Sequence, residues 1–585
     1  MIKQELEITS HQWKKIFPNH KKINFKKIFV IFHSDKINSF INSKKKFVYF
    51  CRKGTKFNGH QFAKTILDSQ NFIVADKKEL TSCFSENKLP AHYSNFIFFT
   101  KDIEKKLNKT LEIAFHLKNK DFKFIAITGT NGKTSTVQIT SQLLNHLTKQ
   151  KILNLGTLGA CIGHKKLPIS HVTMPDFPSL CETLNLYKNN YKSKYVIMEA
   201  TSHGLKENRF GNFKVHYAGF TNLTQDHLDY HKTMDDYKKS KLLLFKKYMF
   251  KNSSVVIERE SNGNENFWKT CVNNSNIKNL IALLNIENLN NFDTFLSDCK
   301  LNKKIDYLFL KNSQHTIRGS QGKLIFYKKN VLKFKKSDLE KISTLKNKIN
   351  DFISYGFHKN NRELPLNENT ILIHFLKKYF KKSEYKIDFP LLGKFQCENI
   401  LIAIGYCIQL KFSLRDIIFY LKKLKPIDGR LEIAYKNPLV LVDYAHTPDA
   451  LEKSLKTCRE LLPENGRLTV VFGCGGNRDE LKRPLMGKTS SELADILYIT
   501  SDNPRRENPN KIIQDILKGI PILKEKIIHI EPNRETSIKI ALKNSLQTDI
   551  ILIAGKGHEN YQEINNLKIP YNDIEVVKNY FKENH

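Results

Sequence analysis

The segment with the clearest chemistry reads IAITGTNGKTST and contains Lys133 and Thr134. A short apolar strand is expected over Phe124–Ile127, followed by a glycine-rich turn and a helical run over Val137–Leu147. Backbone N–H groups of such a turn and of a helix N-terminus point toward a bound anion. The ammonium of Lys133 would neutralise phosphate charge, and the hydroxyl of Thr134 would bind Mg²⁺. The segment therefore predicts a nucleotide phosphate site.

The glycine spacing of this turn differs from the usual phosphate-binding motif. That motif has a Gly five positions before Gly132, but Ile127 stands there and the first Gly is Gly129. A chance Gly-Lys-Thr in a Lys-rich chain is the alternative. The strand before the turn and the helix after it favour a shortened phosphate loop.

Two further expected strands end in side chains that suit a metal ion. The strand Tyr195–Glu199 ends in a carboxylate, and a strand over Ala218–Leu223 is followed by Asp226 and His227. Ligands of α/β proteins bind at the carboxyl ends of parallel strands, and carboxylate oxygens suit Mg²⁺. A solvated strand end and a polar loop that caps a helix are the alternatives.

The last third of the chain repeats this arrangement with loops rich in Gly, Asn and Arg. Strands are expected over Leu439–Val442, Leu468–Phe472, Ile496–Thr500 and Ile550–Ala554. The loops after them read DYAHTPDA, GCGGNRD, SDNPRREN and GKGHE. Glycine lets a backbone approach a ligand closely, and Arg pairs with carboxylates or phosphates. Four such loops at one sheet edge predict a ligand crevice.

Length and charge bound the class of protein. The 585 residues are too many for one core, so several domains are expected. Lys and Arg number 96 against 58 Asp and Glu, a formal charge of +38. This charge would suit the binding of nucleic acid. The excess of basic residues is nearly all Lys, however, and it is evenly spread along a chain with many Asn and Ile, a composition that AT-rich coding sequences produce. We expect no nucleic acid partner, and a nucleic-acid-binding ATPase is the remote alternative.

The cysteine and hydropathy patterns bear on location. The 10 Cys form no Cys-x-x-Cys pair, which suits a reducing compartment and argues against a disulfide framework or a structural zinc site. The N-terminus lacks the apolar segment of a signal peptide, and no apolar run reaches the roughly 18 residues that span a bilayer. We expect a cytoplasmic monomer without a membrane span.

The order of strands, loops and helices predicts an α/β fold of three domains. The expected domains are an N-terminal α/β domain (1–121), a central P-loop ATPase-like parallel-sheet domain (122–427) and a C-terminal Rossmann-like α/β domain (428–585).

Strand predictions are weaker outside the motifs. In the first domain, strands are expected over Ile28–Phe32, Phe47–Phe50 and Phe72–Ala75. The stretch 252–388 is polar and poor in periodicity, and within it only Ser254–Ile257 and Thr370–Phe375 read as strands.

Taken together, ten segments resemble the Mur ligases, and within them the UDP-N-acetylmuramoyl-tripeptide synthetases (the MurE type). They run in family order from 125 to 562 and read ITGTNGKTS, MEATSHGL, FTNLTQDHLDYH, KLLLF, DFPLLGKFQCEN, DGRLE, VDYAHTPDALEK, VFGCGGNRDELKRPLMG, TSDNPRREN and IAGKGHENYQ. The first domain resembles the family's UDP-binding domain more loosely, through His33–Lys36 and Asn58–His60. The stretch 252–388 looks longer than usual and carries little resemblance.

The resemblance implies a ligase of cell wall precursor synthesis that uses ATP and Mg²⁺. ATP would phosphorylate the terminal carboxylate of UDP-N-acetylmuramoyl-L-alanyl-D-glutamate, and the amine of a third amino acid would attack the acyl phosphate. The implied catalytic residues are Lys133, Glu199, His227 and Lys241, of which Glu199, His227 and a carbamylated Lys241 would join Thr134 as metal ligands. The implied ATP-binding residues are Gly129, Thr130, Asn131, Gly132, Lys133, Thr134, Ser135, Asn222, Arg430 and His446. On composition alone, Lys241 reads as a surface lysine.

The choice of amino acid is implied by a second set of positions. Residues that would hold the incoming diamino acid are Arg478, Asp502, Asn503, Pro504, Arg505, Gly555 and Glu559. The Asp-Asn-Pro-Arg form is the family's mark for meso-diaminopimelate, whose distal carboxylate an Arg can bind in a bidentate pair. L-Lysine lacks that carboxylate. We therefore predict meso-diaminopimelate as the added residue, with L-lysine as the alternative.

Departures from the family pattern fall on the nucleotide-sugar side. The implied UDP-muramoyl contacts are Ser34, Thr173, Met174, Thr201, Glu207 and Arg209. Met174 stands where a second Thr is usual, Thr201 replaces a Ser, and Glu207 replaces a Gln, so these substrate contacts are expected to differ. A sibling Mur ligase, a folylpolyglutamate synthetase and a catalytically silent scaffold are the remaining alternatives.

Overall fold

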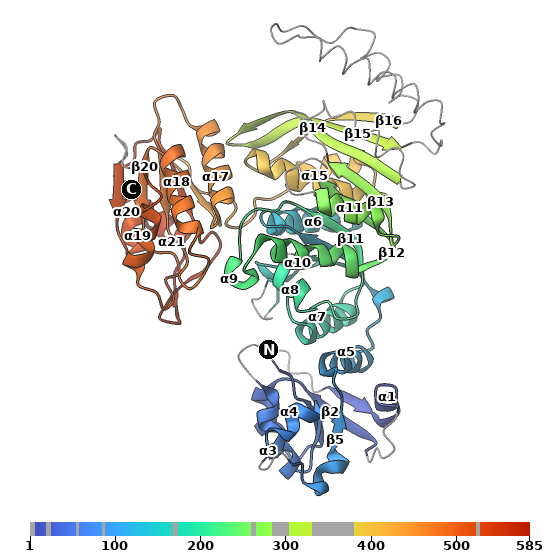
Figure 1. Cartoon of the computed structure of the whole chain (residues 1–585). Coiled ribbons are helices and arrows are strands. Elements are labelled where there is room, and N and C mark those ends of the chain that lie inside the picture. Colours follow the sequence, from blue (N-terminus) through green and yellow to red (C-terminus); the bar gives the residue numbers. More distant parts are fainter. Residues whose placement is uncertain are drawn as a thin grey trace, which may run out of the picture. The chain divides into compact units, whose positions relative to one another are not determined.

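The computed structural model describes most of the chain (Figure 1). The described residues are 6–18, 25–53, 58–84, 88–163, 165–167, 173–258, 265–283, 304–329, 380–521 and 527–584. Contacts divide the chain into two compact units. One comprises 1–124, 151–196 and 203–214, and the other comprises 125–150, 197–202 and 215–585.

The first unit contains a five-stranded sheet in the order β1-β2-β3-β4-β5, parallel except for β1. Its strands are β1 (Glu7–Thr9), β2 (Lys27–Ile31), β3 (Phe47–Phe50), β4 (Phe72–Ala75) and β5 (Ile97–Phe99). Its helices are α1 (Ser10–Lys14), α2 (Ile37–Asn42), α3 (Ala63–Asp68), α4 (Lys77–Thr81) and α5 (Ile103–Ala114). Every residue of β3 and β4 is buried, as expected for parallel strands covered on both faces. The three strand predictions for this region are confirmed.

The rest of the first unit is a small antiparallel meander and one long helix. The strands are β7 (Leu153–Gly156), β8 (Gly159–Ile162) and β9 (Lys165–Lys166), and the helix is α7 (Phe177–Asn190). Asp176 caps α7 by accepting a hydrogen bond from the N–H of Ser179, and Pro178 fits the first turn, where its missing N–H costs nothing.

The second unit contains the central sheet, with strands in the spatial order β16-β15-β14-β13-β12-β11-β6-β10. The strands are β6 (Lys123–Thr128), β10 (Tyr195–Glu199), β11 (Val215–Phe220), β12 (Met249–Glu258), β13 (Ile277–Leu283), β14 (Lys304–Thr316), β15 (Gly319–Lys329) and β16 (Phe380–Phe389). The helices are α6 (Lys133–Thr148), α8 (Ser202–Lys206), α9 (Leu228–His231), α10 (Met234–Lys247), α11 (Glu265–Asn273), α15 (Lys394–Gln409) and α16 (Leu414–Leu421). Helix α15 packs against α6, β12 and β14.

The stretch 252–388 is better structured than its sequence pattern indicated. The predicted strand Ser254–Ile257 is confirmed inside β12, whereas Thr370–Phe375 lies outside the described residues. Strands β14, β15 and β16 form an antiparallel extension of the central sheet. Most of β16 is exposed between Lys381 and Lys386, so its polar side chains gave no apolar alternation to detect.

One strand boundary was wrong. The predicted strand Ala218–Leu223 is observed as β11, which ends at Phe220. Thr221 still donates its N–H to the carbonyl of Thr128 in β6 at 3.0 Å, while its side chain donates to the phosphate loop at Asn131. The side chain of Asn222 also binds this loop, by accepting from the N–H of Asn131 at 2.9 Å.

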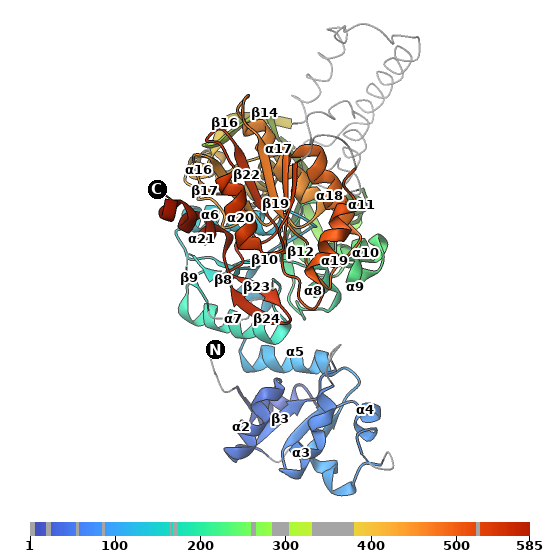
Figure 2. The same cartoon turned by 90° about the vertical axis from the view of Figure 1, so that its left-hand side faces the viewer.

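The C-terminal domain is a six-stranded sheet in the order β17-β18-β22-β19-β20-β21, covered on both faces (Figure 2). The strands are β17 (Glu432–Tyr435), β18 (Leu439–Asp443), β19 (Leu468–Phe472), β20 (Ile496–Ile499), β21 (Ile527–Ile530) and β22 (Ile550–Ala554), with a separate hairpin of β23 (Tyr561–Ile564) and β24 (Leu567–Pro570). One face packs α17 (Pro448–Leu461), α18 (Lys482–Leu493) and α19 (Pro509–Leu517). The other packs α20 (Arg534–Lys543) and α21 (Asp573–Asn584). The four strands predicted here are confirmed.

Candidate functional site

The phosphate loop joins β6 to α6 and is built around two glycines. Gly129 and Gly132 have φ values of +147° and +82°, a region that L side chains rarely adopt. A Cβ on Gly129 would lie 1.9 Å from Thr221 Oγ1, and a Cβ on Gly132 would lie 2.4 Å from Asn399 Oδ1. Gly132 is the N-cap of α6, so the first N–H groups of this helix face the loop. The turn therefore has the backbone geometry of an anion cradle, and its binding of a nucleotide phosphate stays a prediction.

Two lysines converge on one carbonyl of this loop. Lys133 Nζ donates to the carbonyls of Gly129 (3.0 Å) and Thr130 (2.7 Å), and Lys241 Nζ donates to Gly129 at 2.6 Å. Burial lowers the pKa of Lys133, while Glu199 and Asp226 oppose this shift. The pKa of Lys241 falls well below its usual value because of burial and the charge of Lys133. The surface position that composition alone predicted for Lys241 is wrong, because its side chain is only 1% exposed.

Asn131 ties the phosphate loop to two other elements. Its N–H donates to Asn222 Oδ1 at 2.9 Å, and its carbonyl accepts from Thr221 Oγ1 at 2.6 Å. Its side-chain amide donates to Asp449 Oδ2 at 2.7 Å, in the first turn of α17. The loop is thus held from β11 and from the C-terminal domain.

The acidic side chains at this site lie where their strands predicted. Glu199 ends β10 and is 1% exposed. Asp226 is 6% exposed, and although burial favours its neutral form, the nearby side chains of His227, His446 and Lys482 keep its pKa well below the usual value. His227 Nε2 lies 3.3 Å from Asp226 Oδ2, and His227 has the unusual φ of +57°. Such a conformation persists only where its surroundings enforce it.

The C-terminal domain contributes Arg430 and His446 to the same region. Arg430 Nη2 donates to Thr134 Oγ1 at 3.0 Å, and its guanidinium carbon lies 4.6 Å from the centre of the Tyr444 ring. Arg430 Nε is buried without a hydrogen-bond partner among the described residues. Burial and the charge of Lys482 lower the pKa of His446 to about 4. The orphaned guanidinium N–H suits an anionic ligand. The neutral His446 donates from Nδ1 to the carbonyl of Tyr444 at 2.8 Å, which leaves Nε2 as a hydrogen-bond acceptor.

The loops predicted to hold the amino acid meet at the carboxyl edge of the C-terminal sheet. Arg505 Nη1 donates to the carbonyl of Gly476 at 2.8 Å, which joins the loop after β20 to the loop after β19. Asn503 Nδ2 donates to Glu559 Oε2 at 2.9 Å, which joins it to the loop after β22. A Cβ on Gly555 would lie 3.1 Å from Asp502 Oδ2. The structure therefore brings these predicted residues together.

Arg478 and Pro504 complete this set. Arg478 is about half exposed, and its Nη1 lies 3.9 Å from Asp229 Oδ2 of α9. The carbonyl of Pro504 lies 2.1 Å from where a Cβ on Gly476 would stand, which explains the glycine there. Asp502 Oδ1 is buried without a hydrogen-bond partner among the described residues, and it lies 3.7 Å from Lys556 Nζ.

The residues predicted to bind the UDP-muramoyl substrate are spread over both compact units. Arg209 Nη1 donates to the carbonyl of Met174 at 2.6 Å, and its Nη2 donates to Glu207 Oε2 at 2.7 Å. Thr173 Oγ1 lies 3.4 Å from Thr157 Oγ1. Ser34 begins a short 3₁₀ helix after β2, at the N-terminal sheet of the first unit. Thr201 follows β10 in the second unit.

Several residues that contact the predicted site residues were not singled out from the sequence. Lys556 is fully buried and donates to Asn503 Oδ1 at 3.0 Å and to Glu559 Oε2 at 2.8 Å. Its place inside the GKGHE segment was a signal for it. Asp449 had the same kind of signal, because it lies inside the VDYAHTPDALEK segment. Glu563 lacked one, because its partners are distant in sequence.

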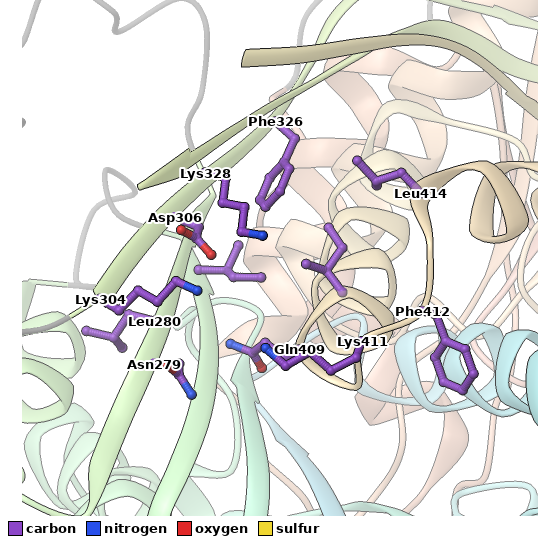
Figure 3. Close-up of a pocket in the computed structure, with 12 residues that line it drawn as sticks. Asn279, Leu280, Lys304, Asp306, Phe326, Lys328, Gln409, Lys411, Phe412 and Leu414 are labelled. Atoms are coloured by element: carbon purple, nitrogen blue, oxygen red, sulfur yellow. The ribbon is translucent and has the colours of Figure 1, made fainter. Parts of the chain in front are cut away.

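A separate cavity of about 240 Å³ lies between β13, β14, β15 and the end of α15 (Figure 3). Lys304, Asp306, Lys328 and Gln409 line it together with apolar side chains. None of the predicted site residues lines this cavity. The candidate site is therefore the phosphate loop and the C-terminal loops rather than this cavity.

Two features of the described residues concern metal binding and membrane insertion. Within them, no cluster of three or more His, Cys, Asp or Glu side chains could hold a metal ion. The metal ligands predicted from the resemblance are not a cluster of this type, because two of the four are Thr134 and a carbamylated Lys241. No helix in the described part of the chain is long and apolar enough to cross a bilayer.

Two family models match the chain. One, described as the Mur ligase middle domain, matches residues 127–317, and the other, described as the Mur ligase glutamate ligase domain, matches residues 429–557. The first match extends into the stretch where the sequence showed little resemblance, so that expectation was wrong as far as residue 317.

Full-length relatives are similar over most of the chain. A Rickettsia felis protein named UDP-N-acetylmuramoyl-L-alanyl-D-glutamate–2,6-diaminopimelate ligase is 34% identical over 536 residues, covering 91% of this chain and 93% of the relative. An Aquifex aeolicus protein of the same name is 33% identical over 538 residues, covering 92% and 91%.

Solved structures share the fold. One titled as a UDP-N-acetylmuramoyl-L-alanyl-D-glutamate–2,6-diaminopimelate ligase matches with a TM-score of 0.57 at 24% identity, over 98% of this chain and 99% of that chain. A Mycobacterium tuberculosis folylpolyglutamate synthase complexed with ADP and AMPPCP matches with a TM-score of 0.53 at 14% identity, over 77% and 92%.

Proposed function

The chain belongs to the Mur ligase family, and we propose that it adds meso-diaminopimelate to UDP-N-acetylmuramoyl-L-alanyl-D-glutamate in peptidoglycan precursor synthesis. The observation that carries the proposal is the near-full-length similarity to ligases of that name at 33–34% identity. The reaction would activate the D-glutamate carboxylate as an acyl phosphate, with ATP as phosphoryl donor. The amine of the diamino acid would then form the amide bond and release phosphate and a proton.

The phosphate loop fits the phosphoryl donor. The N–H groups at the start of α6, together with Lys133, would bind the phosphates and stabilise the charge that develops during transfer. Arg430 would turn its orphaned Nε toward the same anion. His446, neutral at physiological pH, can accept a hydrogen bond there without adding charge.

The proposed Mg²⁺ would shield the phosphate charge, and Thr134, Glu199, His227 and a carbamylated Lys241 would hold it. Lys241 as an ammonium cannot bind a cation. Its lowered pKa favours the neutral amine, which is the form that adds CO₂ to give an anionic carbamate. Asp226 is kept anionic by its neighbours, and the charge of Lys133 is one of the causes that lower the pKa of Asp226.

The C-terminal loops fit a diamino acid with a second carboxylate. Asp502 and Glu559 offer oxygens to the ammonium group, and Arg505 offers N–H donors to the distal carboxylate. L-Lysine would leave Arg505 and its surroundings without that partner, a mismatch that sites built for hydrogen bonding reject strongly.

A competition experiment tests the proposal. The purified protein is given the UDP-muramoyl dipeptide, ATP, Mg²⁺ and equal concentrations of meso-diaminopimelate, L-lysine and D-alanyl-D-alanine, and the product is weighed by mass spectrometry. We expect the diaminopimelate product alone, and no product from a Lys133→Met control. A lysine product of comparable yield would overturn the choice of amino acid, and absence of ADP formation with every amino acid would overturn the reaction.

A further inference from the structure

Glu563, in β23, contacts two residues of the proposed amino-acid site through three of its own polar groups. Its N–H donates to Asn503 Oδ1 at 2.8 Å. Its carbonyl accepts from the N–H of Arg505 at 2.9 Å, and its carboxylate accepts from Arg505 Nε at 3.0 Å. One residue therefore holds both the backbone and the side chain of Arg505.

Arg505 depends on such support because of its backbone. Its φ is +55°, in the left-handed region that a residue with a Cβ adopts only at a cost. Besides the bond to Glu563, the carbonyl of Arg505 accepts from the N–H of Asn565 at 2.6 Å, and Arg505 forms an isolated parallel bridge with Ile564. The hairpin of β23 and β24 thus fixes the conformation from which the Arg505 side chain starts.

The hydrogen bonds of the guanidinium determine which donor remains for a ligand. Nε is bound to Glu563, and Nη1 is bound to the carbonyl of Gly476. Among the described residues, Nη2 of Arg505 makes no hydrogen bond. The carboxylate of Glu563 and the carbonyl of Gly476 together fix the plane of the Arg505 guanidinium. The direction of its remaining N–H donors is therefore set before a ligand binds.

The ion pair itself contributes little to folding. The side chains of Arg505 and Glu563 are 21% and 23% exposed, and solvent screens a pair at this exposure. Its main effect is therefore the orientation of Arg505. The carboxylate also offsets part of the guanidinium charge, which disfavours anions that cannot satisfy its geometry.

We propose that Glu563 is a positioning residue that aims Arg505 at the distal carboxylate of the incoming amino acid, which makes the β23–β24 hairpin an element of substrate selection. The inference rests on the proposed function, because it assigns Arg505 to the amino-acid substrate. It adds a residue that acts through Arg505 and does not itself touch the substrate.

Steady-state kinetics of full-length variants test the role of Glu563. Glu563→Ala removes the acceptor that holds Nε, so the guanidinium of Arg505 can rotate. We expect the KM for meso-diaminopimelate to rise about tenfold, which corresponds to the loss of one hydrogen bond to a charged group. The kcat and the KM for ATP should stay within about twofold, because the phosphate site is unchanged. Glu563→Gln keeps an oxygen acceptor for Nε and should recover a KM within about threefold of wild type.

A double-mutant cycle separates positioning from general damage. In an Arg505→Ala background, Glu563→Ala should change the KM by less than about twofold, because there is no guanidinium left to aim. The matched control is Glu535→Ala, which removes an exposed carboxylate paired with Lys539 at 2.8 Å on α20 of the same domain. This control should leave every kinetic constant unchanged.

Three results would overturn the inference: an unchanged KM in Glu563→Ala, a full additional effect in the Arg505→Ala background, or equal rises in all KM values with a lower Tm. Failure of the proposed function is distinguishable from these. If wild type uses another amino acid, the proposed substrate is wrong, and the same variants assayed with that amino acid still decide the role of Glu563.

Discussion

Replacement of Lys241 by methionine should stabilise the nucleotide-free protein while it removes activity. Lys241 Nζ is buried, and its one hydrogen bond among the described residues goes to the carbonyl of Gly129 at 2.6 Å. The amine also lies 4.3 Å from the centre of the Tyr237 ring. Methionine has a similar length and no polar hydrogen, so Lys241→Met removes the amine with little change in packing.

The magnitude follows from counting donors. An ammonium has three N–H donors and here has one acceptor, and each unsatisfied buried donor costs about 1–3 kcal/mol. This cost lowers the pKa of Lys241 and leaves a neutral amine with one N–H unpaired. In Lys241→Met the carbonyl of Gly129 keeps Lys133 as a donor at 3.0 Å, so no new orphan arises. We expect a gain of about 1–2 kcal/mol in the free energy of unfolding.

Thermal unfolding in CO₂-depleted buffer without nucleotide measures this gain, as a rise of about 1–2 °C per kcal/mol for a domain of roughly 300 residues. Lys239→Met, on the exposed side of the same helix where Lys239 is 70% exposed, is the matched control and should change stability by less than about 0.5 kcal/mol. Amino-acid-dependent phosphate release should fall at least about 100-fold in Lys241→Met. A lower Tm in Lys241→Met, or activity close to wild type, would refute the argument from burial.

Three further predictions concern the loop, the pH response and the C-terminal core. Gly132→Ala should weaken nucleotide binding at least about tenfold, because φ is +82° and the new Cβ meets Asn399 at 2.4 Å; an unchanged Kd in a fluorescent-nucleotide titration would contradict this. Since the folded pKa of His446 lies near 4, below its unfolded value near 6.5, only the unfolded state gains a proton between these pH values. Stability should therefore fall as pH drops from 7 to 5, by up to about 2 kcal/mol more in wild type than in His446→Asn, in denaturant melts at both pH values. Asp573→Ala should cost about 3–5 kcal/mol because it leaves the buried guanidinium of Arg534 without its carboxylate; a cost below about 1 kcal/mol would contradict it.

The elements predicted correctly are those whose signal is local. The strand Leu468–Phe472 is buried throughout, and its sequence is apolar except for Thr469 and lies between polar segments. The phosphate loop was predictable for a similar reason, because the two glycines, Lys133 and the following helix stand next to one another in the chain. A local pattern of this kind needs no knowledge of distant partners.

The elements that were missed depend on contacts between distant residues. Lys241 lies in a helix with lysines on both sides, and only the tertiary structure shows that this one faces the interior. Glu563 meets Arg505 through a hairpin that begins 56 residues later in the chain than Arg505, so no spacing rule links them. Strand β16 is an exposed edge whose polar residues resemble a loop.

The hydroxyl of Thr134 connects the two halves of the proposed chemistry. Its oxygen accepts from Arg430 of the C-terminal domain at 3.0 Å, and it is also the oxygen proposed to bind Mg²⁺. Asn131, in the same loop, donates to Asp449 of that domain at 2.7 Å. A movement of the C-terminal domain must therefore change the hydrogen bonds of the phosphate loop. By linkage, whatever binds the phosphate loop must bias the placement of that domain by the same free energy. The loops that carry Arg505 belong to this domain, so nucleotide binding and amino-acid binding are expected to depend on one another.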